Sequence, residues 1–314
     1  MAFVRATARV TDDVAQVHVV HLNDSVAIAG DAVESPIEKA RRERRRALIV
    51  PREHGAWGLL LVPMITGAGV AFRHSHNVFP FVLLLTAALA LFWLRTPAES
   101  LLGTSAMHAE NEEERHNVIF VAAYLAAIAV MALGMLLVAG RNPDLWLIGG
   151  AVAVAFAAQA FIRRLGRGAR MTAQVVGTFG LTAGAPAAYY VITGKFDATA
   201  WMLWAVNLIF AGNQIHYVQL RIHTARAQGL RAKLARGWTF SCGQIVMLAV
   251  LGLACVRGMM PWIALIAFAP ILIRGWLYFF EKPAPLAVRQ LGWSELRQAV
   301  VFCVLFIAAL ALTR

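Results

Sequence analysis

The chain has 314 residues, of which 60% are hydrophobic and 15% charged, and its formal net charge is +12 at pH 7. A soluble domain of this length would carry more apolar side chains than its core could bury. The composition therefore excludes an ordinary soluble globular protein and indicates a chain that lies in a lipid bilayer.

The first 50 residues differ from the rest. The stretch "TDDVAQVHVVHLNDSVAIAGDAVESP" is polar and acidic, and "KARRERRRALIV" is strongly basic. No signal peptide fits, because the start lacks a basic segment followed by a long apolar one. We predict a disordered cytoplasmic tail over residues 1–50, with a small β-hairpin around 14–28 or an overlong start as alternatives. The basic run is interpreted as an anchor to anionic lipid, and no nucleic-acid partner is predicted.

Residues 51–314 form the predicted transmembrane domain, because apolar runs follow one another from Gly55 onward. Each run matches the roughly 20 residues that a helix needs to cross a bilayer. We predict an all-α polytopic fold with about nine spans near 55–72, 78–95, 117–139, 144–162, 173–193, 199–217, 238–256, 259–280 and 297–312. Gly180 and Gly184 form a small-residue pattern that favours close helix packing.

The distribution of basic residues predicts the orientation. With nine spans, one set of connections carries most of the Lys and Arg, including the runs at 41–46, 163–170 and 221–236. Because basic loops stay on the cytoplasmic side, we expect the N-terminus to be cytoplasmic.

Polar residues that could form a site occur at the start of the first predicted span and in the connection after the second. Glu53 and His54 stand at the start of the first span, either as an interfacial helix start or as site residues, since an imidazole can carry protons near neutral pH. The connection 95–117 holds Glu99 and the acidic residues 110–114, which could bind a divalent cation or simply form a solvated helix start. No cofactor is predicted, and Glu99 is the candidate ligand if Mg²⁺ is bound.

Two later stretches add further candidates. Polar groups in the last turns of an apolar helix are costly unless they face a partner or a cavity, so the sixth span predicts a polar cavity. Its candidate binding residues are Asn213, His216, Tyr217, Arg221, Arg226 and Arg231. The arginines suit phosphate, or they only enforce topology. Glu295 opens the last predicted span, where the helix dipole alone would favour it.

Three segments carry a family resemblance: "PREHGAW" at the first span, Tyr217-Val218 leading to Arg221, and "LGWSELRQAVVF" before the last span. They resemble the YwiC-like family of bacterial integral membrane proteins over about residues 51–312, which implies a location in the inner membrane of a bacterium. More widely, "RAQGLRAKLARG" is similar to the end of the second metal motif of UbiA-type intramembrane prenyltransferases, which implies a nine-helix bundle. However, Arg221 and Ala225 stand where that superfamily has Asp, so its Mg²⁺-dependent chemistry is not expected.

Three functions are compatible with these features. The first is binding or transfer of a polyprenyl or quinone-type lipid at a cytoplasmic-side cavity; if the protein is an enzyme, His54 and His216 are the candidate acid/base residues of prenyl or alkyl transfer. The second is a non-catalytic membrane partner protein. The third is a small-solute transporter, against which stands the scarcity of ionisable residues at the span centres, with Arg274 as the main exception.

Overall fold

The computed structural model describes residues 36–50, 54–103, 107–140, 143–225, 227, 229–282 and 287–313. The chain divides into two compact units, Met1–Arg42 and Glu43–Arg314. All elements of the described residues are helices, which confirms the all-α fold class. The tail predicted over residues 1–50 includes α1 (Pro36–Ile49), whereas residues 1–35 lie outside the described part of the chain.

The larger unit contains the remaining helices. In chain order they are α2 (His54–Ala71), α3 (Phe79–Leu101), α4 (Glu112–Val138), α5 (Pro143–Arg164), the short 3-10 helix η1 (Arg167–Ala169), α6 (Arg170–Thr182), α7 (Gly184–Thr193), α8 (Ala198–Thr224), α9 (Leu230–Val256), η2 (Trp262–Phe268), α10 (Ala269–Phe280) and α11 (Val288–Leu312). Each predicted span overlaps one helix or a consecutive pair.

Seven helices of the described chain, counting α6 with α7 and η2 with α10 as one each, are long and apolar enough to cross a membrane. The protein is therefore a multi-pass helical membrane protein, although this criterion does not reach the predicted count of nine. Of the nine predicted spans, two fall outside it, those of α2 and α8. The apolar part of α2, Trp57–Ala71, is short, and α8 carries polar side chains such as Asn207, Asn213 and Gln214.

Helix α7 forms the centre of the larger unit. Its residues 185–192 are all buried, and it packs against α2, α3, α5 and α8. The chain bends at Ala183 between α6 and α7, where one continuous span was predicted. Pro186 explains the bend, because a proline has no N–H to donate to the carbonyl four residues earlier, here that of Thr182.

Glycines allow the closest helix crossings around α7. A Cβ added to Gly67 of α2 would overlap the carbonyl oxygen of Ala185, so only glycine fits this crossing. A Cβ on Gly184 would lie 2.7 Å from Cγ of Met64, and one on Gly180 would touch Cβ of Ala155 at 3.4 Å. The predicted close packing at Gly180 and Gly184 is confirmed.

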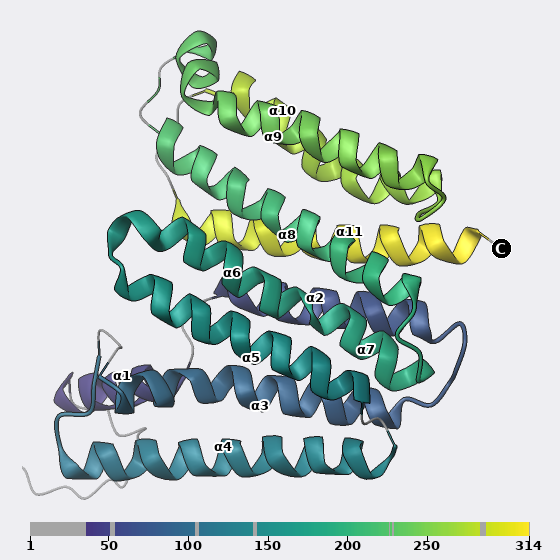
Figure 1. Cartoon of the computed structure of the whole chain (residues 1–314). Helices are drawn as coiled ribbons and strands as arrows, with labels where there is room; N and C mark the ends of the chain where they lie inside the picture. Colours follow the sequence, from purple (N-terminus) through teal and green to yellow (C-terminus); the bar gives the residue numbers. More distant parts are fainter. Residues whose placement is uncertain are drawn as a thin grey trace, which may run out of the picture. The chain divides into compact units, whose positions relative to one another are not determined.

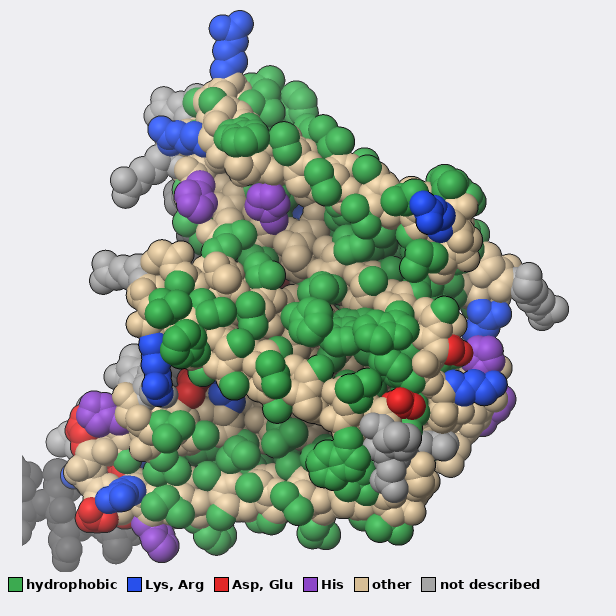
Figure 2. Space-filling view, viewed as in Figure 1, with side chains coloured by type: hydrophobic (Ala, Val, Ile, Leu, Met, Phe, Trp, Pro, Cys, Tyr) green, Lys and Arg blue, Asp and Glu red, His purple; other side chains and the backbone are tan. Residues whose placement is uncertain are grey.

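The helices of the larger unit run side by side, and their ends gather at two sides (Figure 1). Helices α3, α5 and α8 end on one side, at the left of the picture, and α2, α4, α7 and α9 end on the other. Hydrophobic side chains cover the middle of the face in Figure 2, and most charged side chains lie toward its margins. This pattern fits helices that cross a bilayer, with their apolar middle in the lipid and their charged ends at its two surfaces.

Candidate functional site

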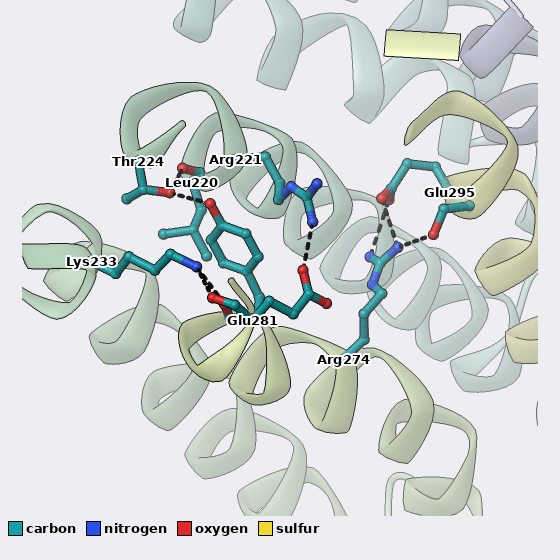
Figure 3. A network of polar contacts seen from close by, with 9 residues as sticks. Leu220, Arg221, Thr224, Lys233, Arg274, Glu281 and Glu295 are labelled. Carbon is teal, nitrogen blue, oxygen red and sulfur yellow. Dashed lines mark hydrogen bonds and ion pairs between the residues drawn. The ribbon is translucent and has the colours of Figure 1, made fainter. Parts of the chain in front are cut away.

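A buried ion pair joins α10 to α11 (Figure 3). Nη1 of Arg274 donates to Oε1 of Glu295 at 2.7 Å, and Nη2 donates to Oε2 at 3.2 Å. The two side chains are only 13% and 11% exposed. The Arg274 guanidinium also lies 4.0 Å from the ring centre of Tyr217 on α8. A bidentate pair fixes both distance and orientation, so it holds α10 and α11 together. The contact of Arg274 with Tyr217 adds α8 to this group.

A second group of contacts surrounds the C-terminal end of α10 (Figure 3). Nη1 of Arg221 donates to Oε2 of Glu281 at 3.2 Å, and its guanidinium lies over the ring of Tyr278. Lys233 is 2% exposed and donates to the carbonyl oxygens of Tyr278 and Glu281 at 3.2 and 2.7 Å. The hydroxyl oxygens of Thr224 and Tyr278 are 2.6 Å apart. Lys233 therefore caps the last carbonyls of α10.

Buried amides continue the polar contacts into the bundle. Nδ2 of Asn213 donates to Oε1 of Gln244 on α9 at 2.9 Å. Nε2 of Gln214 donates to the carbonyl oxygen of Glu295 at 2.9 Å. Oδ1 of Asn213 and Nε2 of Gln244 are buried without a partner. Helix α8 thus presents polar groups to both α9 and α11.

Four of the predicted site residues take part in the contacts between α8 and its neighbours: Asn213, Tyr217, Arg221 and Glu295. One boundary prediction is wrong, because α11 begins at Val288 and Glu295 is its eighth residue. Its carboxylate is therefore bound by Arg274 rather than exposed at a helix start. The polar residues before 297 lower the hydropathy of this segment, so the apolar run alone predicted a start that is too late.

Of the other predicted residues, His216 also lies on α8, and the rest lie elsewhere or outside the described part. His216 is half-buried and packs edge-on against Phe240, with ring centres 5.3 Å apart. Arg231 is exposed in the first turn of α9. His54 begins α2, and nothing of its side chain is described. Glu53 and Arg226 lie outside the described residues.

A cavity of about 1040 Å³ lies in the other half of the larger unit. Its walls come mainly from α3 and α5, which pack against α4 and α6 respectively and both against α7. Apolar side chains dominate the lining, among them Ala87 and Phe92 of α3, Phe156 of α5 and Ala187 of α7. None of the residues of the α8–α11 contacts described above belongs to this lining.

The cavity has one charged end. Arg95, Glu99, Arg163 and Arg164 all belong to the lining. Nε of Arg95 lies 2.9 Å from Oε1 of Glu99, and Nη1 of Arg163 lies 3.6 Å from the same oxygen. Figure 2 shows charged side chains at the left-hand end of a hollow between α4 and α5. The cavity is therefore amphipathic, with apolar walls and a guanidinium-rich end.

The acidic residues at the start of α4 contact α1. Oε1 of Glu114 accepts from Nε of Arg44 at 2.9 Å, and Glu113 pairs with Arg45 at 2.7 Å. The hydrogen bond to Glu114 raises the pKa of Arg44 above its ordinary value. Among the described residues, no group of three or more His, Cys, Asp or Glu side chains lies close enough together to hold a metal ion. Glu99, the candidate Mg²⁺ ligand, is paired with arginines.

Some functional contacts were not predicted. Arg274 stood out in the sequence as an ionisable residue in an apolar span, but its partner Glu295 did not follow from spacing. Arg95 and Arg163 were counted only as basic residues of cytoplasmic connections. Arg95 and Glu99 are i, i+4 neighbours on α3, so their contact is local. The position of Arg163 next to Glu99 depends on how the end of α5 approaches α3, which no local pattern encodes. The only feature of the sequence that pointed to this charged end was the presence of arginines at the ends of two apolar runs, 78–95 and 144–162.

Comparison with known proteins gives one match. Residues 50–189 match the model of a family described as YwiC-like protein, which confirms the predicted resemblance over that part of the chain. No curated protein and no solved structure gives a significant match. The matched segment runs from α2 to α7 and contains every residue that lines the cavity.

Proposed function

We propose that this YwiC-like membrane protein binds a lipid of the polyprenyl or quinone type, with the apolar chain in the cavity between α3 and α5. The observation that carries the proposal is the amphipathic lining: apolar walls lead to Arg95, Glu99, Arg163 and Arg164 at one end. A long apolar chain with a polar head has the same division of chemistry.

The volume of the cavity supports a chain-like ligand. Pockets that enclose small molecules usually measure roughly 300–1,000 Å³, and this one has about 1040 Å³. A chain inside it would contact residues such as Leu84, Leu91 and Leu133. A solute without an apolar part would make no favourable contacts with these apolar walls. The lining therefore favours a lipid over a small polar transport substrate.

The family match supports the same location. Its segment covers the helices around the cavity and ends before α8, so the cavity lies within the YwiC-like part of the chain. In the other half, Arg221 is paired with Glu281 and Arg274 with Glu295. Arg95, Arg163 and Arg164 line the cavity and Arg221 does not, which favours the Arg95 end as the position of the head group.

The orientation and the chemistry are part of the proposal. The excess of basic residues at this side of the helices favours a cytoplasmic position for the charged end. Prenyl or alkyl transfer, with His54 and His216 as acid/base residues and Glu99 as a metal ligand, stays a prediction. Binding of a lipid requires none of these three roles.

The test is to identify the lipid that purifies with the protein. Lipids extracted from the purified chain are compared by mass spectrometry with those of the solubilised membrane. We expect enrichment of an isoprenoid or quinone-type lipid. Ala87→Phe places a ring in the cavity and should remove it, whereas Ala127→Phe on the exposed face of α4 should retain it. A bulk lipid composition in all three proteins would overturn the proposal.

A further inference from the structure

We infer that the charged end of the cavity is a subsite for a phosphate head group, in which the Glu99 carboxylate occupies the position that the ligand's phosphate takes. This inference rests on the proposed lipid binding and adds the class of head group. Neither the family match nor the apolar walls indicate it. It comes from the arrangement of three arginines around one carboxylate.

Two guanidinium groups converge on one oxygen atom. Arg95 from α3 and Arg163 from α5 both approach Oε1 of Glu99, at 2.9 and 3.6 Å. The two arginines come from helices on opposite walls of the cavity, and Arg164 contributes a third guanidinium to the lining. Oε1 of Glu99 therefore marks a point where an anionic oxygen is held between the walls.

The charge at this end favours a ligand with more negative charge than one carboxylate. Among the charged lining residues there are three guanidinium groups and a single carboxylate. A phosphate monoester carries about −1.5 to −2 charges at pH 7 and presents three acceptor oxygens. Guanidinium groups match phosphate with paired hydrogen bonds, and the apolar surroundings strengthen such contacts. A phosphate head therefore has enough charge and acceptor oxygens to engage all three arginines.

Glu99 is able to give way to such a ligand. Its side chain is 37% exposed, and it lies on the same helix as Arg95, one turn away. The Arg95 side chain is 26% exposed, so the pair is open to solvent in part, and water can solvate the carboxylate when a ligand displaces it. In this arrangement Glu99 keeps the arginines in place before binding and competes with the ligand. Its removal should strengthen the binding of an anion.

A cation at the same position would give the opposite result. If Glu99 were the ligand of Mg²⁺ or of a cationic head group, neutralising it would weaken binding, and neutralising the arginines would strengthen it. The sign of the effect of Glu99→Gln thus separates the two chemistries without a structure of the complex.

The experiment measures equilibrium binding of radiolabelled hexadecyl phosphate to the full chain in phosphatidylcholine nanodiscs, with empty nanodiscs subtracted. Hexadecanol, hexadecyltrimethylammonium and inorganic phosphate are the competitors. The variants are Arg95→Gln, Arg163→Gln and Glu99→Gln. Arg257→Gln is the matched control, because Arg257 is exposed after α9 at the other side of the helices. Thermal unfolding of each variant verifies that it is folded.

We expect hexadecyl phosphate to bind at least tenfold more tightly than hexadecanol. Each arginine variant should lose about tenfold or more in affinity, the range for a hydrogen bond to a charged group. Glu99→Gln should gain several-fold, and Arg257→Gln should match the wild type.

Three results would overturn the inference: equal affinity for hexadecanol and hexadecyl phosphate, weaker binding by Glu99→Gln, or competition by inorganic phosphate at equal affinity. The last would assign the subsite to free phosphate. Equal binding of both chain probes together with a co-purified isoprenoid would leave the proposed lipid binding intact. Failure of every chain probe and of lipid co-purification would overturn both.

Discussion

Arg274 and Glu295 pair through both carboxylate oxygens, at 2.7 and 3.2 Å, inside two helices that are apolar enough to cross a membrane. Ionisable side chains in such helices are expensive unless they are partnered. The pair faces α8, where Tyr217 covers the guanidinium. It therefore specifies how α8, α10 and α11 fit together.

Removing one partner of this pair should lower the free energy of unfolding more than replacing both partners by apolar side chains. We expect Arg274→Met alone to lower the free energy of unfolding by about 3–5 kcal/mol, because Glu295 would stay buried without its partner. The double variant Arg274→Met/Glu295→Leu should recover most of that loss. Thermal unfolding in detergent, followed by size-exclusion chromatography, measures the effect. If the losses of Arg274→Met and Glu295→Leu simply add in the double variant, the two charges are not coupled.

The crossing of α2 and α7 gives a second prediction. Gly67→Ala should destabilise the protein by roughly 1–3 kcal/mol, because the new Cβ would overlap the backbone of Ala185. Gly134 of α4 has no atom within 4 Å of an added Cβ. Gly134→Ala should therefore be neutral or stabilising by up to about 1 kcal/mol. Equal unfolding temperatures for the two variants would contradict the close crossing.

The contact of Arg44 with the start of α4 should protect the connection between α3 and α4. Arg44 binds Glu114, which is buried, and Nη2 of Arg44 donates to the carbonyl oxygen of His108. We expect Arg44→Glu to increase proteolytic cleavage between residues 102 and 111 several-fold. The double variant Arg44→Glu/Glu114→Arg should restore part of the protection.

Arg45→Glu is the matched control for this prediction. The pair of Arg45 and Glu113 is mostly exposed, with side chains 50% and 71% accessible. Such pairs contribute little. Rapid cleavage of both the Arg44→Glu and the Arg45→Glu variants would show that general charge, rather than the contact with Glu114, protects the connection.

The apolar runs of the sequence were enough to locate the membrane-spanning helices. Each run overlaps a helix, because a bilayer forces its spanning segments to bond their own backbone. The helix ends were less predictable. Helix α3 continues to Leu101 and α9 begins at Leu230, well beyond the apolar runs. Hydropathy detects only the part inside the lipid, whereas backbone hydrogen bonding continues through polar turns outside it.

The candidate site was predictable only in part. The polar residues of α8 stood out because they interrupt an apolar run, and the structure partners Asn213 with Gln244. The cavity could not be predicted, since it arises where α3 and α5 remain apart between their own neighbours. At its charged end, Arg95 and Glu99 are i, i+4 neighbours on α3, whereas Arg163 comes from α5, which is distant in sequence. Spacing carries no information on the contact between Arg163 and Glu99.

The predicted orientation can be tested with single cysteines in a Cys242→Ser background, because Cys242 is the exposed cysteine of the three. Leu165→Cys and Lys195→Cys place thiols at exposed positions after α5 and after α7, on opposite sides of the helices. A membrane-impermeant maleimide should label position 195 in intact cells and position 165 only after permeabilisation. The reverse pattern would place the arginine-rich end of the cavity outside the cytoplasm.

The most direct test of lipid binding in the cavity is photo-crosslinking with a hexadecyl phosphate that carries a diazirine in its chain. After irradiation of the protein in nanodiscs, peptide mass spectrometry locates the attached probe. We predict labels on α3 and α5 at lining residues such as Leu91 and Phe156, and their loss in excess unlabelled hexadecyl phosphate. Labels spread evenly over the lipid-exposed faces of α4 and α9, unchanged by the competitor, would contradict a lipid site in this cavity.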